Sequence, residues 1–224
     1  MIVTVLSPKG GCGKSTSALM LASVFARNED LSVAIVDADP RQSLARVWLG
    51  KRKENGLEPP PFAVISDHSD SSILDTLDRL NGEHDLVFVD LEGVAGLMAS
   101  YAASSADLCL VPMRPSALDG DAAGAALRMI RDAGRAARRD IPARILLTQT
   151  DAAILTTSYR ELLAELDQAG VPRLKTELIR RAPYERVMAE GRTLFELTSS
   201  HSVSNAISNV AHLGKELADI LESE

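Results

Sequence analysis

Residues 8–16 hold the stretch that decides the fold, and they read Pro8-Lys9-Gly10-Gly11-Cys12-Gly13-Lys14-Ser15-Thr16. Before them stands a short apolar run, Ile2-Val3-Thr4-Val5-Leu6, that is typical of a buried strand. After them, residues 14–27 lack glycine and repeat apolar side chains as a helix packed on a sheet does. Glycines let backbone N–H groups turn toward phosphate oxygens, and a helix N-terminus adds its positive dipole. The order strand, glycine-rich turn, helix therefore predicts a phosphate-binding loop.

Lys14 and Ser15 have separate tasks in such a loop. Lys14 can reach the β- and γ-phosphates of a nucleotide, and the Ser15 hydroxyl can bind Mg²⁺. A glycine-rich turn with an incidental lysine is the alternative, but the position between a strand and a helix argues against it. The expected nucleotide contacts are Lys9, Gly10, Gly11, Cys12, Gly13, Lys14, Ser15 and Thr16.

The rest of the chain alternates between strand-like and helix-like segments. Apolar runs predict buried strands at residues 33–36, 62–65, 86–89, 108–111 and 144–147, and a last short strand near 176–179. Helical patterns lie at residues 43–52, 72–80, 95–105, 122–139 and 158–169, and near 184–190 and 205–221. Because strands covered by helices on both faces form parallel sheets, we expect a doubly wound α/β fold with a mainly parallel sheet.

Composition and charge limit the class of protein further. The 224 residues contain no Gly/Ser/Pro-rich linker, so we expect one domain over residues 1–224, with a surface loop at residues 51–61. Cys12 and Cys109 are too few for a disulfide framework or a CxxC metal site, and no run of about 18 apolar residues could span a bilayer. A cytoplasmic protein is expected. The net charge of −7 argues against a uniformly basic nucleic-acid binder and leaves room for a local basic patch.

Carboxylates follow two of the predicted strands. Asp37 and Asp39 come directly after the second strand, and Asp90 ends the run Leu86-Val87-Phe88-Val89. Since α/β proteins bind ligands at the carboxyl ends of their strands, these groups are expected beside the phosphate loop. Asp90 has the form of a carboxylate that holds a Mg²⁺-bound water. An aspartate pair at a strand end can instead cap a helix and form a turn.

The pattern Lys-Gly-Gly-x-Gly-Lys-Ser/Thr at residues 9–15 resembles the deviant Walker A motif of the ParA/MinD superfamily of ATPases. Position 8, where the usual motif has glycine, holds Pro8, and Lys9 precedes the glycine pair. Segments 176–182 and 184–196 are similar to the C-terminal pattern of ParA proteins, so the resemblance covers most of the chain. With no DNA-binding extension before the loop, the chain resembles the small ParA-type partition or positioning ATPases, including the VirC1-like orphan group.

This resemblance implies catalytic roles for Lys9, Lys14 and Asp39. Lys9 is implied to reach the nucleotide of the partner subunit in a homodimer that forms with ATP, and Asp39 to position the attacking water. The implied cofactors are ATP and Mg²⁺. Ser15, Asp37 and Asp90 are the expected metal residues.

Three further positions complete the implied site. Thr148 and Gln149 follow the sixth strand and are implied to lie near adenine, with ordinary solvation of a strand end as the alternative. The family usually continues with Asp-x-Pro after the Walker B carboxylate, whereas this chain has Leu91 and Glu92 after Asp90. The geometry of that loop and the role of Glu92 stay open.

The resemblance implies a ParA-type ATPase that binds DNA nonspecifically as an ATP-bound dimer on the nucleoid. It would position or segregate a plasmid, a chromosome region or a protein cluster, and a ParB-like or other adaptor would stimulate hydrolysis. A MinD-type membrane-positioning ATPase and a P-loop metabolic enzyme such as a small-molecule ligase are the alternatives. The acidic C-terminal segment, residues 213–224, should be repelled by anionic lipid, so no membrane partner is expected.

Two groups of basic residues are candidate DNA contacts. The first group follows the helix predicted at residues 122–139, and its spacing gathers the side chains within roughly a 100° arc. It comprises Arg128, Arg131, Arg135, Arg138 and Arg139. The second group is C-terminal and comprises Arg173, Lys175, Arg180 and Arg181. A solvated helix face is the alternative for the first group.

Overall fold

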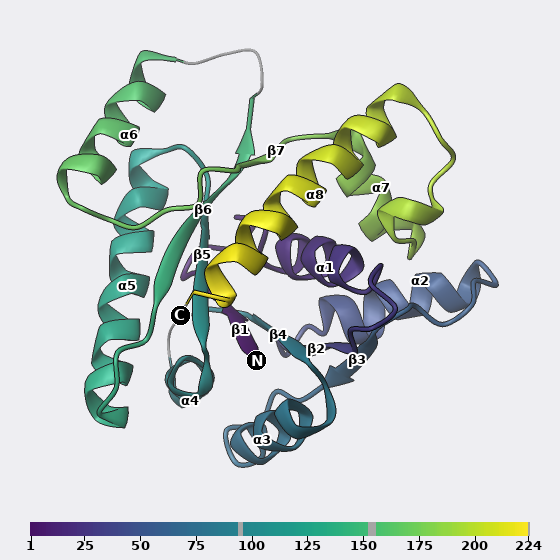
Figure 1. Ribbon diagram of the computed structural model, residues 1–224, viewed down its shortest axis with the longest axis horizontal. Coiled ribbons are helices and arrows are strands. Elements are labelled where there is room, and N and C mark those ends of the chain that lie inside the picture. The colour runs from purple at the N-terminus through teal and green to yellow at the C-terminus, as the bar shows by residue number, and fades with distance from the viewer. Residues whose placement is uncertain (94–95, 152–155, 224) are drawn as a thin grey trace.

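The computed structural model describes residues 1–93, 96–151 and 156–223, in which a parallel sheet is covered by helices on both faces (Figure 1). Within these ranges the strands are β1 (Ile2–Val5), β2 (Val33–Ala38), β3 (Ala63–Ser66), β4 (Leu86–Leu91), β5 (Leu108–Met113), β6 (Ala143–Thr150) and β7 (Leu178–Ile179). Their order in the sheet is β3-β2-β4-β1-β5-β6-β7, and the described pairings are parallel. The predicted doubly wound α/β fold is confirmed.

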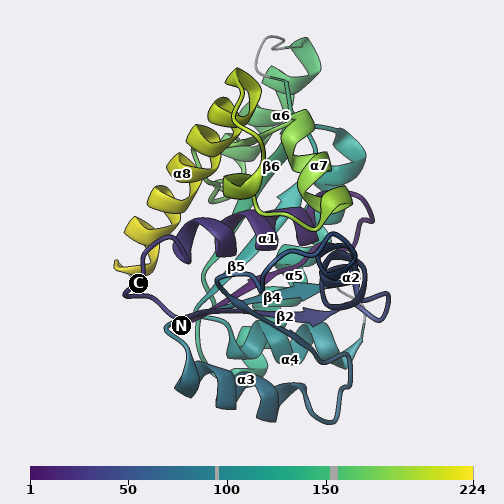
Figure 2. The same ribbon diagram turned by 90° about the vertical axis from the view of Figure 1, so that its right-hand side faces the viewer.

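Helices divide between the two faces of this sheet. On one face lie α1 (Lys14–Phe25), α7 (Ala182–Glu190) and α8 (His201–Leu221), together with a π-helical turn (Ser43–Trp48) that continues into α2 (Leu49–Glu54). On the other face lie α3 (Ile73–Glu83), α4 (Leu97–Ser105), α5 (Ala117–Ala137) and α6 (Thr157–Gln168). Figure 2 shows α1 and α8 on the side of the sheet opposite to α3 and α4.

The strands feed both cores because their side chains alternate between the faces. In β1, Val3 and Val5 pack with α1 and α8, whereas Ile2 belongs to the core under α3, α4 and α5. The Thr4 hydroxyl points to the second face and donates a hydrogen bond to the carbonyl oxygen of Ala102 at 3.0 Å. A strand buried on both sides needs apolar residues at nearly every position, which explains the unbroken apolar runs in the sequence.

Element boundaries depart from the predictions in two places that matter for function. The helix predicted at residues 122–139 begins at Ala117, because the Ser116 side chain accepts a hydrogen bond from the backbone N–H of Asp119 and caps it. It ends at Ala137, where Arg138 adopts a left-handed conformation with φ 56°. Residue 95, the predicted start of another helix, lies outside the described residues.

The segment predicted as a surface loop at residues 51–61 begins instead as part of α2, and Arg52 is buried with 3% of its surface exposed. Its guanidinium donates to both carboxylate oxygens of Glu196, at 2.7 and 2.9 Å, and to the carbonyl oxygen of Gly191 at 3.1 Å. The hydrogen bonds that Arg52 donates to Glu196 lower the pKa of that carboxyl group to about 2. The guanidinium also lies 5.6 Å from the ring centroid of Trp48. This network fastens α2 to the end of α7.

Gly191 is the point of closest approach between these two segments. It has φ 66°, and a Cβ atom there would lie 2.7 Å from the Cα of Arg52, in collision with the backbone of α2. Gly170 has a similar φ of 61°, but nothing lies within 4 Å of its Cβ position.

We therefore expect Gly191→Ala to lower the free energy of unfolding by more than about 3 kcal/mol, since it adds a backbone clash to the left-handed strain. Gly170→Ala is the matched control and should cost only about 1 kcal/mol, because it introduces the strain alone. Urea unfolding of both variants at neutral pH measures the difference. Equal losses would contradict the close packing of α2 on Gly191.

Candidate functional site

The glycine-rich loop leaves the sheet at the C-terminal end of β1, between β4 and β5, and leads directly into α1. Gly11 and Gly13 have φ of 73° and 94°, a left-handed conformation that residues with a side chain rarely adopt. After β1 the chain continues to β2 on one side of β1, whereas after the neighbouring β5 it continues to β6 on the other side. Open α/β sheets form a ligand crevice where the strand order reverses in this way. The predicted order of strand, glycine-rich turn and helix is confirmed.

Lys14 lies in the first turn of α1 with its side chain folded back over the loop. The residue is 9% exposed, and its Nζ donates to the carbonyl oxygen of Lys9 at 3.2 Å. A cavity of about 300 Å³ opens beside it, lined by residues of the loop and by Asp39, Glu92 and Gln149. The loop therefore surrounds a space, named the phosphate cavity below, that a chain of phosphates could enter, with an ammonium group at its edge.

Lys9 points elsewhere, and it is not found among the described residues that line this cavity. Its Nζ lies 3.1 Å from Oδ1 of Asp119, a side chain that is only 1% exposed. Arg114 binds the same carboxylate through Nε at 2.8 Å and Nη2 at 3.1 Å. Burial alone would raise the pKa of Asp119, but the hydrogen bonds from Arg114 and Lys9 outweigh it and hold that pKa well below its usual range. Lys9 is thus held by α5 of its own chain.

Neither Asp119 nor Arg114 was predicted from the sequence. The local signal was the Ser116-x-x-Asp119 spacing of a capped helix directly after an apolar strand. That spacing could have predicted where α5 begins. It could not have predicted that the capping region also binds Lys9.

Asp37 caps the helical segment that follows β2. Its Oδ2 accepts from the backbone N–H of Leu44 at 2.8 Å and of Ala45 at 2.7 Å, and its Oδ1 accepts from Asp39 at 3.3 Å. Burial raises the pKa of Asp37, and these amide donors oppose that change. The structure therefore shows the capping role that the sequence left as an alternative. Asp39 lines the phosphate cavity, and its Oδ1 accepts from the backbone N–H of Arg41 at 2.8 Å.

Asp90 stands beside Asp37, since the two residues are paired in the register of β2 and β4. Both carboxylate oxygens of Asp90 are buried, and neither has a hydrogen-bond partner in the part of the chain that the structure describes. Burial raises its pKa to about 7, although the nearby Ser15 hydroxyl and Lys14 ammonium favour the ionised form. Such orphaned oxygens fit a site for a hydrated cation or a water molecule.

The described residues contain no group of three or more His, Cys, Asp or Glu arranged to hold a metal ion. A Mg²⁺ ion near Ser15 and Asp90 would therefore take most of its ligands from phosphate oxygens and water. That is the usual coordination of Mg²⁺ in phosphate-transferring proteins, so the donor set fits this ion.

Thr148 and Gln149, at the end of β6, fasten the glycine-rich loop to the sheet. The Thr148 hydroxyl donates to the carbonyl oxygen of Cys12 at 2.7 Å, and Nε2 of Gln149 donates to that of Gly11 at 2.7 Å. Gln149 holds this position in a left-handed conformation, with φ 54°. A second cavity of about 290 Å³ adjoins both residues and reaches Tyr184 on α7.

The predicted basic residues fall into separate places. A hollow of about 750 Å³ lies at the end of α5 and the start of β6, at the edge of the sheet away from the glycine-rich loop, and it is lined by Arg131, Arg135, Arg138, Arg139 and Arg144. Because α5 ends at Ala137, the predicted helical arc is wrong for the last two predicted members of the first group. Arg139 instead donates to the carbonyl oxygens of Ser104 and Ala106. Arg128 is exposed outside the hollow.

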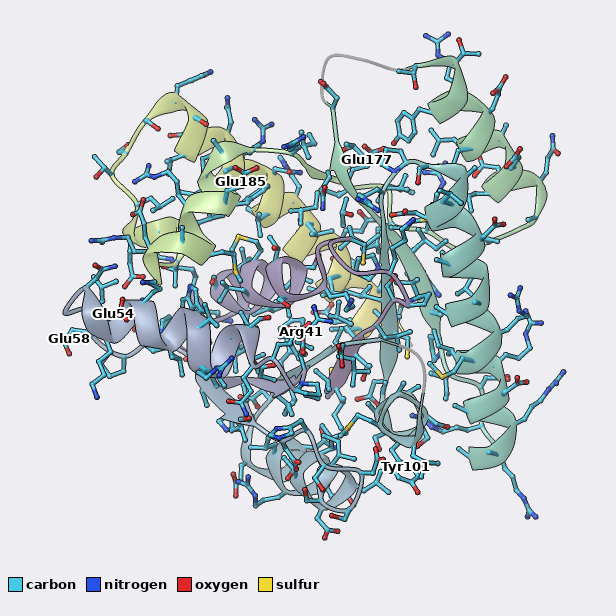
Figure 3. The ribbon with its side chains drawn as sticks, turned by 180° about the vertical axis from the view of Figure 1, so that it is seen from behind. Arg41, Glu54, Glu58, Tyr101, Glu177 and Glu185 are labelled. Atoms are coloured by element: carbon cyan, nitrogen blue, oxygen red, sulfur yellow. The ribbon has the colours of Figure 1, made fainter. Side chains whose placement is uncertain are left out.

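The C-terminal group is divided. Arg180 and Arg181 line the second cavity beside α7, and Arg180 lies 3.8 Å from Glu185 (Figure 3 labels Glu185). Arg173 binds Asp167 at 3.1 Å. The two arginines after β7 are therefore close to the glycine-rich loop, whereas the hollow is remote from it.

A parallel sheet with a glycine-rich loop after its central strand, and with strand-end carboxylates beside that loop, defines the P-loop class of nucleotide-hydrolysing proteins. Comparison with known proteins gives the family. The family model described as VirC1 protein matches residues 1–223. Protein ParA of Rhizobium radiobacter is 33% identical over 225 residues, which cover 98% of this chain and 99% of that protein.

Two further relatives extend this similarity. Maintenance of carboxysome distribution protein A of Halothiobacillus neapolitanus is 30% identical over 196 residues, 87% of each chain. The solved structure of the septum site-determining protein MinD of Pyrococcus horikoshii OT3, complexed with Mg-ADP, has a TM-score of 0.71 at 16% identity and covers 98% of both chains. The chain belongs to the VirC1 family and is an ATPase of the ParA/MinD type.

The hydrogen bonds from Thr148 and Gln149 of β6 to the glycine-rich loop, here called the clamp, allow a test with a matched control. We expect Thr148→Val to lower the affinity for a fluorescent ATP analogue about tenfold, because a buried carbonyl oxygen of the loop loses its donor. Thr150 lies on the same strand, and its hydroxyl is buried without a partner among the described residues. Thr150→Val should therefore leave the affinity unchanged. Equal affinities in the two variants would show that the clamp does not shape the loop.

Proposed function

We propose that this chain binds ATP and Mg²⁺ at residues 8–16 and forms a sandwich dimer in which Lys9 reaches the nucleotide of the partner subunit. The observation that carries this proposal is the ion pair between Lys9 and Asp119, since it holds the lysine outside the cavity that its own loop surrounds. A lysine that does not contact the nucleotide in its own loop could bind the nucleotide of a second copy of the chain once Asp119 releases it.

The same proposal assigns the neighbouring residues. Lys14 would bind the β- and γ-phosphates, Ser15 would bind Mg²⁺, and Asp90 would hold a Mg²⁺-bound water through its unpaired oxygens. Asp39, which lines the phosphate cavity, would position the attacking water. Asp37, which also caps the helical segment after β2, would bind a water molecule of the Mg²⁺ shell. Lys9, Lys14 and Asp39 would thus carry catalysis.

Adenine would occupy the second cavity, which is lined by Thr148, Gln149 and Tyr184 among others. This cavity shares Gly13, Thr16, Gln149 and Met188 with the phosphate cavity, so the two adjoin. A base and its phosphates could therefore bind side by side without a change of fold.

We further propose that the dimer binds DNA nonspecifically in the cytoplasm, at the nucleoid, and positions a plasmid, a chromosome region or a protein cluster. A ParB-like or other adaptor would stimulate hydrolysis, and residues 1–224 would act as one ParA-like unit. The similarity to a ParA protein and to a carboxysome distribution protein supports a positioning role. The hollow lined by arginines supports DNA binding, because it gathers cations on an otherwise acidic chain.

The position of α8 favours this function over membrane positioning. Its apolar side chains, among them Val210, Leu213 and Leu217, are buried against α1. A helix that lies in a lipid surface must expose such a face. Among the described residues, no helix is long and apolar enough to cross a membrane.

The two lysines can be separated by mutation. Lys14→Ala should abolish tight binding of a fluorescent ATP analogue, because the β- and γ-phosphates lose their local positive partner. Lys9→Ala should keep most of that binding and lose the ATP-dependent dimer in sedimentation velocity with ATP and Mg²⁺. A normal dimer with normal ATP turnover in Lys9→Ala would refute the role of Lys9 in the partner's site.

The DNA surface can be assigned by charge reversal. We expect wild type to bind random duplex DNA with ATP and not with ADP, and Arg135→Glu/Arg138→Glu to weaken that binding and flatten its salt dependence by about one unit of slope per lost phosphate contact. Arg128→Glu is the matched control on the same helix outside the hollow. If Arg180→Glu/Arg181→Glu weakens binding and the first pair does not, the hollow is not the DNA surface. If wild type ignores DNA in both nucleotide states, DNA binding is not part of the function.

A further inference from the structure

An ion pair joins the segment that follows β2 to the segment that follows β4. Nη2 of Arg41, in the segment after β2, lies 2.7 Å from Oε1 of Glu92, which directly follows β4. The side chains are 73% and 46% exposed. Figure 3 labels Arg41 near the middle of the molecule in that view. The pair therefore spans from the loop of Asp39 to the strand end of Asp90.

Both partners line two cavities at once. One is the phosphate cavity of about 300 Å³ that contains Lys14 and Ser15. The other cavity, of about 490 Å³, adjoins it and is lined by residues such as Pro40, His68 and Met98. Since Arg41 and Glu92 line both cavities, together with Gly10, the ion pair lies where the two cavities adjoin.

The pair is easily exchanged. Exposed ion pairs contribute little to stability, because water and salt screen them and long side chains lose freedom when they form. A terminal phosphate in the neighbouring cavity would offer the guanidinium more negative charge and a bidentate geometry that it binds well. Arg41 can therefore leave Glu92 for a phosphate with little loss.

The backbone of Arg41 links this exchange to the site. Its N–H donates to Oδ1 of Asp39 at 2.8 Å, so the side chain that would follow the phosphate belongs to the residue that orients Asp39. Glu92 in turn stands two residues after Asp90. A nucleotide that draws Arg41 away from Glu92 would thus act on both carboxylate segments.

We propose that Arg41 is a sensor of the terminal phosphate, and that Glu92 competes for its guanidinium. ADP, which lacks that phosphate, leaves the ion pair closed. ATP exchanges it and opens the ion pair at the junction of the two cavities. Glu92 is then a positioning residue that sets the preference for ATP over ADP. This inference rests on the proposed binding of nucleotide at residues 8–16.

Calorimetric titration of the full chain with Mg²⁺, using ADP and a non-hydrolysable ATP analogue, tests the exchange. Glu92→Gln should raise the affinity for the analogue about threefold to tenfold and leave that for ADP unchanged. Arg41→Gln should lower the affinity for the analogue by a similar factor, again without effect on ADP. The double variant should match Arg41→Gln, because Glu92 acts only through Arg41.

The matched control is Glu83→Gln, which breaks an exposed ion pair of similar length, 2.8 Å, between Arg79 and Glu83 on α3. It should change neither affinity. If Glu92→Gln still raises the affinity for the analogue when Arg41 is replaced, Glu92 acts as a bulk charge and the inference is overturned. Unchanged ratios of analogue to ADP affinity in every variant overturn the inference alone. A wild type that binds neither nucleotide overturns the proposed function with it.

Discussion

The site depends on the way the glycine-rich loop is tied to the sheet. Thr148 and Gln149 bind two of its carbonyl oxygens from β6, and Asp119 binds Lys9 from the start of α5. These ties come from one side of β1, whereas the carboxylates that face the loop come from β2 and β4 on the other side. The loop is therefore fastened by side chains from one half of the sheet and faced by carboxylates from the other half.

Much of this arrangement follows from local patterns in the sequence. Buried parallel strands leave unbroken apolar runs, and a glycine-rich turn between a strand and a helix is specific enough to place the phosphate loop. Contacts between distant segments leave no such trace. Arg52 was expected where the helix predicted at residues 43–52 meets a surface loop, yet its partner Glu196 lies 144 residues away and buries it. The same limit applies to the arginines of α5, whose predicted arc assumed that the helix continues past Ala137.

The two arginine groups differ in what surrounds them, which their number in the sequence did not reveal. The hollow beside β6 lies at the edge of the sheet away from the loop, and Arg139 there donates hydrogen bonds to carbonyl oxygens at the C-terminal end of α4. Arg180 and Arg181 line the cavity proposed for adenine. A polyanion in the hollow would therefore not compete with nucleotide for space, whereas one bound beside α7 would. By charge alone the two groups are equally good candidates for DNA binding, and only their positions in the structure distinguish them.

Both ends of the described chain lie on the side of the molecule away from the phosphate loop. Met1 precedes β1 at the edge of the sheet opposite to the loop, and the last turns of α8 lie beside the end of α1, where Gly214 meets Val24 (Figures 1 and 2). A fluorescent protein or an affinity tag joined to either end would project from this edge. The face that carries Lys9 and the loop would stay uncovered, so a labelled chain could be followed in living cells with its glycine-rich loop still accessible.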